Sequence, residues 1–141
     1  MNDIFDDFDI MLFPIHLLRK FHWIVVRVDM INKTLIRIDS LNPIRTKKTS
    51  GNDDDIIGNM FKFLQDENLK QKGIPLNVDE WLIINSIPCP QQQNGYDCGV
   101  FAMMFMDVMI EQIPLNVITQ SNMANYRIKI GLDLMRGKLR Y

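Results

Sequence analysis

The stretch HWIVVRVDMINKTLIRIDSL, residues 22–41, constrains the fold of this chain more than any other. It contains two runs rich in β-branched residues, Trp23–Asp29 and Thr34–Asp39, separated by a short polar connection. Runs of this kind predict two antiparallel strands joined by a tight turn. We expect a turn of two or three residues, which places His22 opposite or nearly opposite Asp39 on one face of the pair.

The segments on either side of this hairpin alternate between strand and helix patterns. Before it, IMLFPIHLL at residues 10–18 predicts a short buried strand broken by Pro14. After it, residues 42–59 are polar and predict a loop that leads into a helix. Acidic residues at the start of that helix and lysines at its end suit the helix dipole, and Gly73 closes it.

The second half of the chain predicts one more strand and two more helices. We expect a strand at Trp81–Ile87, a loop at Pro88–Asp97, and then a helix to about Gln112, with Asp97 as its N-cap. A last amphipathic helix is expected to begin after Ser121 and to reach about Arg136. Strands interleaved with helices in a chain of 141 residues indicate a single α+β domain spanning 1–141.

Charge and apolar patterning exclude several functional classes. The formal net charge is −1, from 16 basic and 17 acidic side chains, so we expect neither nucleic-acid binding nor attraction to a membrane surface. No apolar run approaches the length of a membrane span. The acidic opening MNDIFDDFDIMLFP lacks the basic start of a secretory signal, and we therefore expect an intracellular protein.

The cysteines and histidines do not form a metal-binding pattern. Cys89 and Cys98 fall outside the Cys-x-x-Cys spacing, and His16 and His22 are the only histidines. We therefore expect no structural zinc and no cofactor. A disulfide between the two cysteines is sterically conceivable, but a reducing compartment disfavours it.

Cys98 stands where a polar, turn-prone run meets the apolar start of a helix. A thiol at a helix N-terminus lies at the positive end of the dipole, and a nearby imidazolium would further favour the nucleophilic thiolate. If Asp39 orients His22, these three residues form a nucleophilic site. The residues alone leave an alternative open, in which Cys98 is a small buried residue capped by Asp97 and the hairpin ends are polar by chance.

Gln91, Gln92 and Gln93 precede the Asn94-Gly95 turn signal and offer donors for an oxyanion. A side-chain amide among them could pair with the Cys98 backbone N–H. Three consecutive glutamines could equally form a solvated loop, and the residues themselves do not choose among these possibilities.

Three ordered blocks of this chain resemble the ubiquitin-like-protein-specific proteases, which are also called SUMO or sentrin proteases. The blocks are FPIHL, FHWIVVRVDMINKTLIRIDSL and PCPQQQNGYDCGVFA. The family pattern is a His-Trp that opens a strand, an Asp-Ser-Leu that ends its partner, and then Gln, Asn-Gly and Asp-Cys-Gly. The resemblance implies a papain-like cysteine protease fold, with a mixed sheet packed against helices.

By the same resemblance, His22 is the general base, Asp39 its orienting acid, Cys98 the nucleophile and Gln92 the oxyanion glutamine. Trp23 matches a tryptophan that lines the narrow slot for the substrate's Gly-Gly tail. A slot this narrow admits only glycine, which has no side chain. Asn94 and Gly95 also match the family pattern, and we expect them to bind substrate. His16 matches a position that we expect to be structural, and Asp97 one that we expect to cap the helix or support the nucleophile. Gln93 stands where many members have proline.

The resemblance further implies an isopeptidase or endopeptidase that cleaves after the Gly-Gly end of SUMO or a related modifier, acting as a monomer in the nucleus or cytoplasm. Only twelve residues precede the FPIHL block, so we expect the N-terminal part of the family's domain to be missing. Two other functions stay open: an inactive module that binds a modifier, and an acyltransferase that uses the same cysteine, histidine and aspartate.

Overall fold

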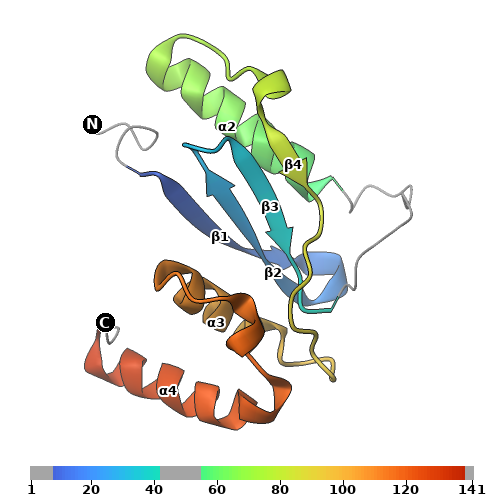
Figure 1. Ribbon diagram of the computed structural model, residues 1–141, viewed down its shortest axis with the longest axis vertical. Coiled ribbons are helices and arrows are strands. Elements are labelled where there is room, and N and C mark those ends of the chain that lie inside the picture. The colour runs from blue at the N-terminus through green and yellow to red at the C-terminus, as the bar shows by residue number, and fades with distance from the viewer. Residues whose placement is uncertain (1–7, 42–54, 139–141) are drawn as a thin grey trace.

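The computed structural model of this chain describes residues 8–41 and 55–138. Its centre is a four-stranded mixed sheet with strand order β1-β2-β3-β4 (Figure 1). The β1–β2 and β2–β3 pairs are antiparallel, and β3–β4 is parallel. The strands are β1 Ile10–Leu17, β2 His22–Asp29, β3 Thr34–Ile38 and β4 Leu82–Ile84.

In the described residues three helices flank the sheet, with α2 on one face and α3 on the other, and α4 lies beyond α3 (Figure 1). This arrangement confirms the expected α+β architecture with a mixed sheet. The helices are α2 Ile56–Lys72, α3 Cys98–Ile110 and α4 Met123–Arg136, and the short 3₁₀ turns are η1 Leu18–Lys20, η2 Val78–Glu80, η3 Leu115–Val117 and η4 Gln120–Asn122.

The apolar run of β2 supplies both faces of the sheet. Ile24, Val26 and Val28 pack in one cluster with side chains of α2. Val25 packs in a second cluster with side chains of α3, among them Phe101. Successive side chains of a strand point to opposite faces, so a strand covered on both faces is apolar at nearly every position. The pattern thereby fixes β2 at the centre of the molecule.

β1 differs from its prediction in two respects. It runs unbroken through Pro14, which pairs with Val25, and none of its residues is fully buried. Proline lacks a backbone N–H and is tolerated where that position faces away from a partner strand, as on an edge strand. β1 lies at the edge of the sheet, and the predictions that it is broken and buried are therefore wrong.

The hairpin register also differs from its prediction. Asp29 pairs with Thr34 and Val25 with Ile38, so the connection spans residues 30–33. Lys33 closes this longer connection with a positive φ of 49°, which the sequence does not signal. Continued by one residue, the register places Asp39 beside Ile24 rather than beside His22. Since His22 and Ile24 are two residues apart, His22 still lies on the same face, diagonally across from Asp39.

Several predicted boundaries change as well. α2 begins at Ile56, inside the segment predicted as loop, while residues 42–54 lie outside the described part of the chain. β4 is shorter than the predicted strand at Trp81–Ile87, and α3 ends at Ile110. The predicted end of α2 is confirmed, because Gly73 adopts a φ of 73° and its N–H donates to the Leu69 carbonyl.

Candidate active site

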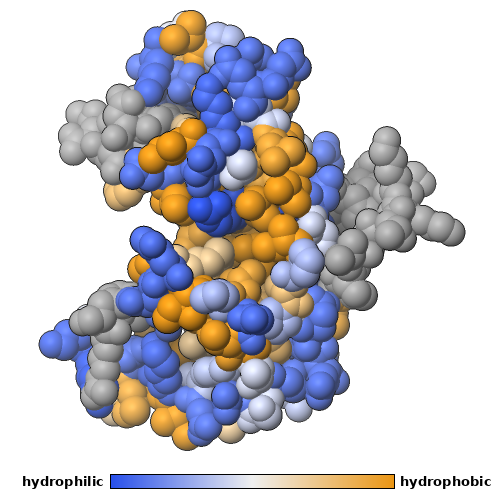
Figure 2. Space-filling model, viewed as in Figure 1, coloured by the Kyte–Doolittle hydropathy of each residue, from blue (hydrophilic) through white to orange (hydrophobic). Residues whose placement is uncertain are grey.

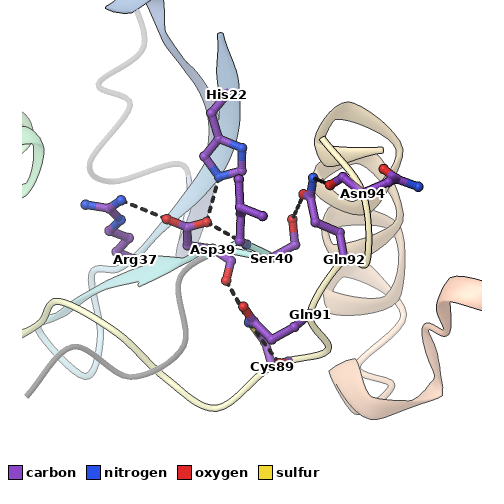
Figure 3. Close-up of polar contacts among 9 residues, drawn as sticks. His22, Arg37, Asp39, Ser40, Cys89, Gln91, Gln92 and Asn94 are labelled. Carbon is purple, nitrogen blue, oxygen red and sulfur yellow. Dashed lines mark hydrogen bonds and ion pairs between the residues drawn. The ribbon is translucent and has the colours of Figure 1, made fainter. Parts of the chain in front are cut away.

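His22 and Asp39 form a buried hydrogen-bonded pair at one end of the sheet (Figure 3). His22 Nε2 lies 2.6 Å from Asp39 Oδ1, and both residues are buried. An ionised carboxylate can only accept, so Nε2 carries the proton and donates it. In the described part of the chain the other ring nitrogen, Nδ1, makes no hydrogen bond. The histidine is therefore held as the tautomer whose Nδ1 can act as a base.

Asp39 is also held by two further donors. Arg37 Nη2 donates to Asp39 Oδ2 at 2.8 Å, and the Leu41 N–H donates to Oδ1 at 3.0 Å. Burial opposes ionisation of Asp39, but the hydrogen bonds from His22, Leu41 and Arg37 outweigh it and lower its pKa to about 2. The carboxylate is consequently charged at neutral pH.

The loop that follows β4 is fastened to the residues directly after β3. The Asp39 carbonyl accepts from the Cys89 thiol at 3.3 Å and from Gln91 Nε2 at 3.0 Å. The Gln92 N–H donates to the Ser40 carbonyl at 2.7 Å. Gln91 Oε1 is buried without a hydrogen-bond partner among the described residues. These contacts place Gln91 and Gln92 beside Asp39 and Ser40, within the structure rather than in a solvated loop, whereas Gln93 is exposed.

Gln92 is buried, and its side-chain amide is fixed at both ends (Figure 3). Its Oε1 accepts from Ser40 Oγ at 2.7 Å, and its Nε2 donates to the Asn94 carbonyl at 2.6 Å. A primary amide has two N–H donors, so one is left for another acceptor. Of the three glutamines, Gln92 therefore offers a preorganised donor.

Asn94 organises the turn that precedes α3. Its Oδ1 accepts from the backbone N–H groups of Tyr96 and Asp97, and its Nδ2 donates to Asp97 Oδ2 at 2.7 Å. The side chain of Asn94 is thus largely engaged inside the loop. Gly95 lies at the exposed tip, where an added Cβ would meet nothing within 4 Å.

Cys98 is the first residue of α3 and is buried. An added Cβ at Gly99 would lie 3.7 Å from Trp23 Cδ1, so Trp23 borders the first turn of α3. Because Trp23 follows His22 and Gly99 follows Cys98, this contact brings the two predicted reactive residues into the same region. In the described residues no hydrogen bond joins them, and such contacts often tighten only when substrate binds.

The indole of Trp23 also contacts His16. The ring centroids lie 4.8 Å apart, and Trp23 keeps 39% of its surface exposed. His16 itself is exposed and pairs with Trp23 across the β1–β2 ladder. His16 thus supports one side of the tryptophan, away from the His22–Asp39 pair.

Asp97 occupies the N-cap position of α3, but its side chain makes no capping hydrogen bond. The expected capping role is therefore wrong for the carboxylate. Its Oδ2 accepts from Gln120 Nε2 at 2.7 Å, and its Oδ1 forms an ion pair with Arg127. Burial opposes ionisation, yet hydrogen bonds led by that from Asn94 lower the pKa of Asp97. The carboxylate ties the loop to η4 and α4 instead.

The sequence alone did not identify the side chains that hold Asp39, Gln92 and Asp97 in place. One signal was available for Arg37, which lies two residues before Asp39 and so on the same face of the strand. The contacts of Gln91 and Ser40 join segments that are distant in sequence, as do those of Gln120 and Arg127. No local pattern predicts such pairs.

The described residues contain no group of three or more His, Cys, Asp or Glu side chains placed to hold a metal ion. Both cysteines are free thiols rather than partners in a disulfide. Among the described helices, none is long and apolar enough to cross a membrane.

Residues 1–137 match the Ulp1 protease family, C-terminal catalytic domain. The chain belongs to this family. It is 32% identical over 133 residues to human sentrin-specific protease 2, covering 93% of this chain and 21% of the relative. It is 33% identical over 137 residues to a sentrin-specific protease of Caenorhabditis elegans, covering 97% of this chain and 18% of the relative.

Solved members of the family share the fold. The C-terminal Ulp1 protease domain in complex with Smt3, the yeast ortholog of SUMO, aligns with a TM-score of 0.63 at 26% identity over 86% of this chain and 50% of that chain. The Chaetomium thermophilum Ulp1-like SUMO protease catalytic domain aligns with a TM-score of 0.76 at 21% identity over 98% of this chain and 49% of that chain. The chain thus has the papain-like α+β fold of this family and spans about half the length of these solved chains.

Proposed function

We propose that this chain is a cysteine isopeptidase or endopeptidase that cleaves after the C-terminal Gly-Gly of SUMO or a related ubiquitin-like modifier. The observation that carries the proposal is the buried His22–Asp39 pair, at 2.6 Å, in the region where α3 begins with Cys98. Membership of the Ulp1 protease family supports it. The solved Ulp1 domain in complex with Smt3 supports SUMO as the partner class.

In the proposed mechanism Cys98 is the nucleophile and His22 the general base. His22 Nδ1 takes the thiol proton as sulfur attacks the carbonyl carbon of the second glycine. Asp39 stabilises the imidazolium through the Nε2 hydrogen bond. His22 then gives the proton to the leaving amine, the carbon–nitrogen bond breaks, and a thioester remains on Cys98. Water, deprotonated by His22, hydrolyses the thioester and restores the thiol.

Gln92 is the proposed oxyanion donor. The tetrahedral intermediate places a negative charge on the former carbonyl oxygen, which requires donors fixed in advance. Gln92 Nε2 has one N–H free because the other is bound to the Asn94 carbonyl. The hydrogen bond that Oε1 accepts from Ser40 keeps the amide from rotating.

Trp23, Asn94 and Gly95 are the proposed substrate contacts. The half-exposed indole beside Gly99 forms a wall next to Cys98, which suits a tail without side chains. Gly95 at the loop tip leaves its backbone open to a bound chain. Asn94 can contribute through its backbone and through the side-chain hydrogen that the loop does not use.

The reacting unit is proposed to be a monomer and a single domain. A thiol nucleophile requires a reduced cysteine, which favours the nucleus or cytoplasm. No cofactor, metal, nucleic acid or membrane takes part in the proposed reaction. The near-neutral net charge of −1 supports the absence of nucleic-acid binding.

A SUMO protein with an electrophilic group in place of its C-terminal carboxylate tests this function. We expect a covalent adduct on Cys98 that is lost in Cys98→Ala and retained in Cys89→Ala. A SUMO without its Gly-Gly end, carrying the same electrophile, serves as the specificity control. Equal labelling by both probes, or labelling that survives Cys98→Ala, contradicts the proposal.

A further inference from the structure

Asp97, the residue before the proposed nucleophile, has a carboxylate bound by several side chains. It is 3% exposed and accepts hydrogen bonds from three side chains, those of Asn94, Gln120 and Arg127. The proposed chemistry uses none of these contacts. Two of the donors come from segments after α3, so residues beyond the helix reach back to the residue that precedes Cys98.

Gln120 makes the most informative of these contacts, because its amide bridges two points of the loop. Its Nε2 donates to Asp97 Oδ2 at 2.7 Å, while its Oε1 accepts from the Gln93 N–H at 2.8 Å. The carboxylate can only accept and the backbone N–H can only donate, so the chemistry of both partners fixes the orientation of the amide. One end of the bridge holds the residue after Gln92, and the other holds the residue before Cys98.

The support beneath Gln120 is part of the core. Ile118 and Met123, on either side of the η4 turn, are 2% and 5% exposed and pack with Phe101 and Phe105 of α3. The turn therefore moves with α3 as one packed unit. A side chain anchored in this way can hold the loop at a fixed distance from the helix.

We propose that Gln120 is a positioning residue, which sets the spacing between the Gln92 amide and the Cys98 thiol by bridging the Gln93 N–H and the Asp97 carboxylate. The inference rests on the proposed function of Gln92 and Cys98. Oxyanion stabilisation depends on donors placed about 2.7–3.1 Å from the developing charge, so a small displacement of the loop weakens it. Gln120 itself touches neither substrate nor reacting atoms.

The test compares Gln120→Met, which keeps the side-chain length but removes both contacts, with Ser121→Ala as a control on the same turn. The Ser121 hydroxyl contacts Thr119 alone among the described residues. Three quantities are measured in the full chain: kcat and KM for an amide-linked SUMO substrate, the alkylation rate of Cys98 by iodoacetamide, and hydrogen exchange of the Gln93 N–H.

We expect Gln120→Met to lower kcat about ten- to hundredfold, less than the loss of an oxyanion donor itself, with KM little changed. Alkylation of Cys98 should stay near the wild-type rate, since it forms no oxyanion, and the Gln93 N–H should exchange faster. Ser121→Ala should match the wild type in all three quantities.

Unchanged kcat, or a parallel fall of kcat and alkylation that indicates general disruption, overturns the inference. Unchanged exchange of the Gln93 N–H also overturns it. A wild-type chain whose Cys98 is alkylated but which cleaves no SUMO substrate overturns the proposed function instead. In that case faster exchange in Gln120→Met still shows that Gln120 holds the loop.

Discussion

At the scale of single residues, Asp39 connects most parts of the site. Its carboxylate accepts from His22, Arg37 and the Leu41 N–H, and its backbone carbonyl accepts from Cys89 and Gln91. The same residue therefore orients the proposed base and fastens the loop that carries the proposed oxyanion donor. A buried carboxylate with this many donors is stable only while it is ionised.

Asp39 should make the stability of the protein fall in acid. Its pKa is lowered from 3.8 to about 2, so the folded state favours the charged form. A lowered carboxyl pKa adds stability that is fully present above the unfolded value and is lost as pH falls through the folded value. We expect a loss on the order of 2 kcal/mol in the free energy of unfolding between pH about 4 and about 2.

Urea unfolding of the wild type and of Asp39→Asn across that pH range measures this contribution. Asp29 and Asp97 also have lowered pKa values and add to the total fall, so the difference between the two proteins isolates Asp39. The wild type should lose more stability than the variant. Parallel pH curves would show that Asp39 is not stabilised in its ionised form.

The two cysteines should differ in reactivity. Burial raises the pKa of Cys89, and its thiol donates to the Asp39 carbonyl. Cys98 is the first residue of α3 and lies in the same region as His22, the proposed base. Iodoacetamide near neutral pH should therefore label Cys98 faster, although Cys98 is the more buried of the two.

Peptide mass spectrometry measures the two labelling rates, and the same reaction in denaturant provides the control, in which the rates should converge. Burial alone predicts the opposite order. Faster labelling of Cys89 in the folded protein would therefore remove the case for an activated Cys98.

At the scale of elements, the site depends on how strand ends and helix starts are aligned. β2 begins at His22, β3 ends one residue before Asp39, and α3 begins at Cys98. Polar residues at the ends of elements avoid the apolar interior of the sheet, where an unpaired polar group is costly. All three side chains are nevertheless buried, so the reactive residues lie at the ends of elements without being exposed.

The end of α2 offers a test of how an element is terminated. Gly73 closes α2 with a φ of 73°. Gly131 instead lies inside α4, and a Cβ added to it would meet nothing within 4 Å. Gly73→Ala should lower the free energy of unfolding by about 1 kcal/mol, because a Cβ is strained in the left-handed region. Gly131→Ala should raise it by roughly 0.5–1 kcal/mol through helix propensity.

Thermal or urea denaturation of both variants measures these effects. Alkylation of Cys98 should be unchanged in each, since neither glycine contacts the site. Equal effects of the two substitutions would mean that the conformation of Gly73 carries no cost for alanine.

At the scale of the whole molecule, the sheet is covered on both faces but the outer surface stays apolar in places. On the face shown in Figure 2, apolar side chains gather across the middle of the molecule, where β4 and α3 lie. β4 exposes Leu82 and Ile83, and α3 exposes Met103 and Ile110. A groove of about 550 Å³ lies between α3 and α4, lined in part by Met103, Ile110 and Leu134.

These surfaces should make the chain associate at high concentration, because contiguous exposed apolar patches favour association. Leu134 lines the groove and Leu18 lies on η1, and both are 77% exposed. Leu134→Lys should therefore weaken association more than Leu18→Lys does. Sedimentation velocity over a range of concentrations compares the variants. Equal effects of the two substitutions would show that the groove is not the associating surface.

The α+β class, the strand at β2 and the helix that begins at Cys98 could be predicted from the sequence. These follow from local patterns, since alternating faces and turn residues are encoded within a few positions. The sequence also placed His22 and Asp39 on a common face, and the structure joins them. The motif residues of the site were readable because they stand at the ends of elements whose type the pattern already indicates.

Tertiary packing sets the register of the hairpin, the position of β1 at the edge of the sheet, and the contacts that hold the site. A longer connection moved Asp39 from opposite His22 to a diagonal position, and no residue type announces that length. Asp97 looked like a cap by its place before a helix, yet its carboxylate is bound by Gln120 and Arg127. Such contacts arise from packing between distant segments, and their geometry depends on every element that lies between them.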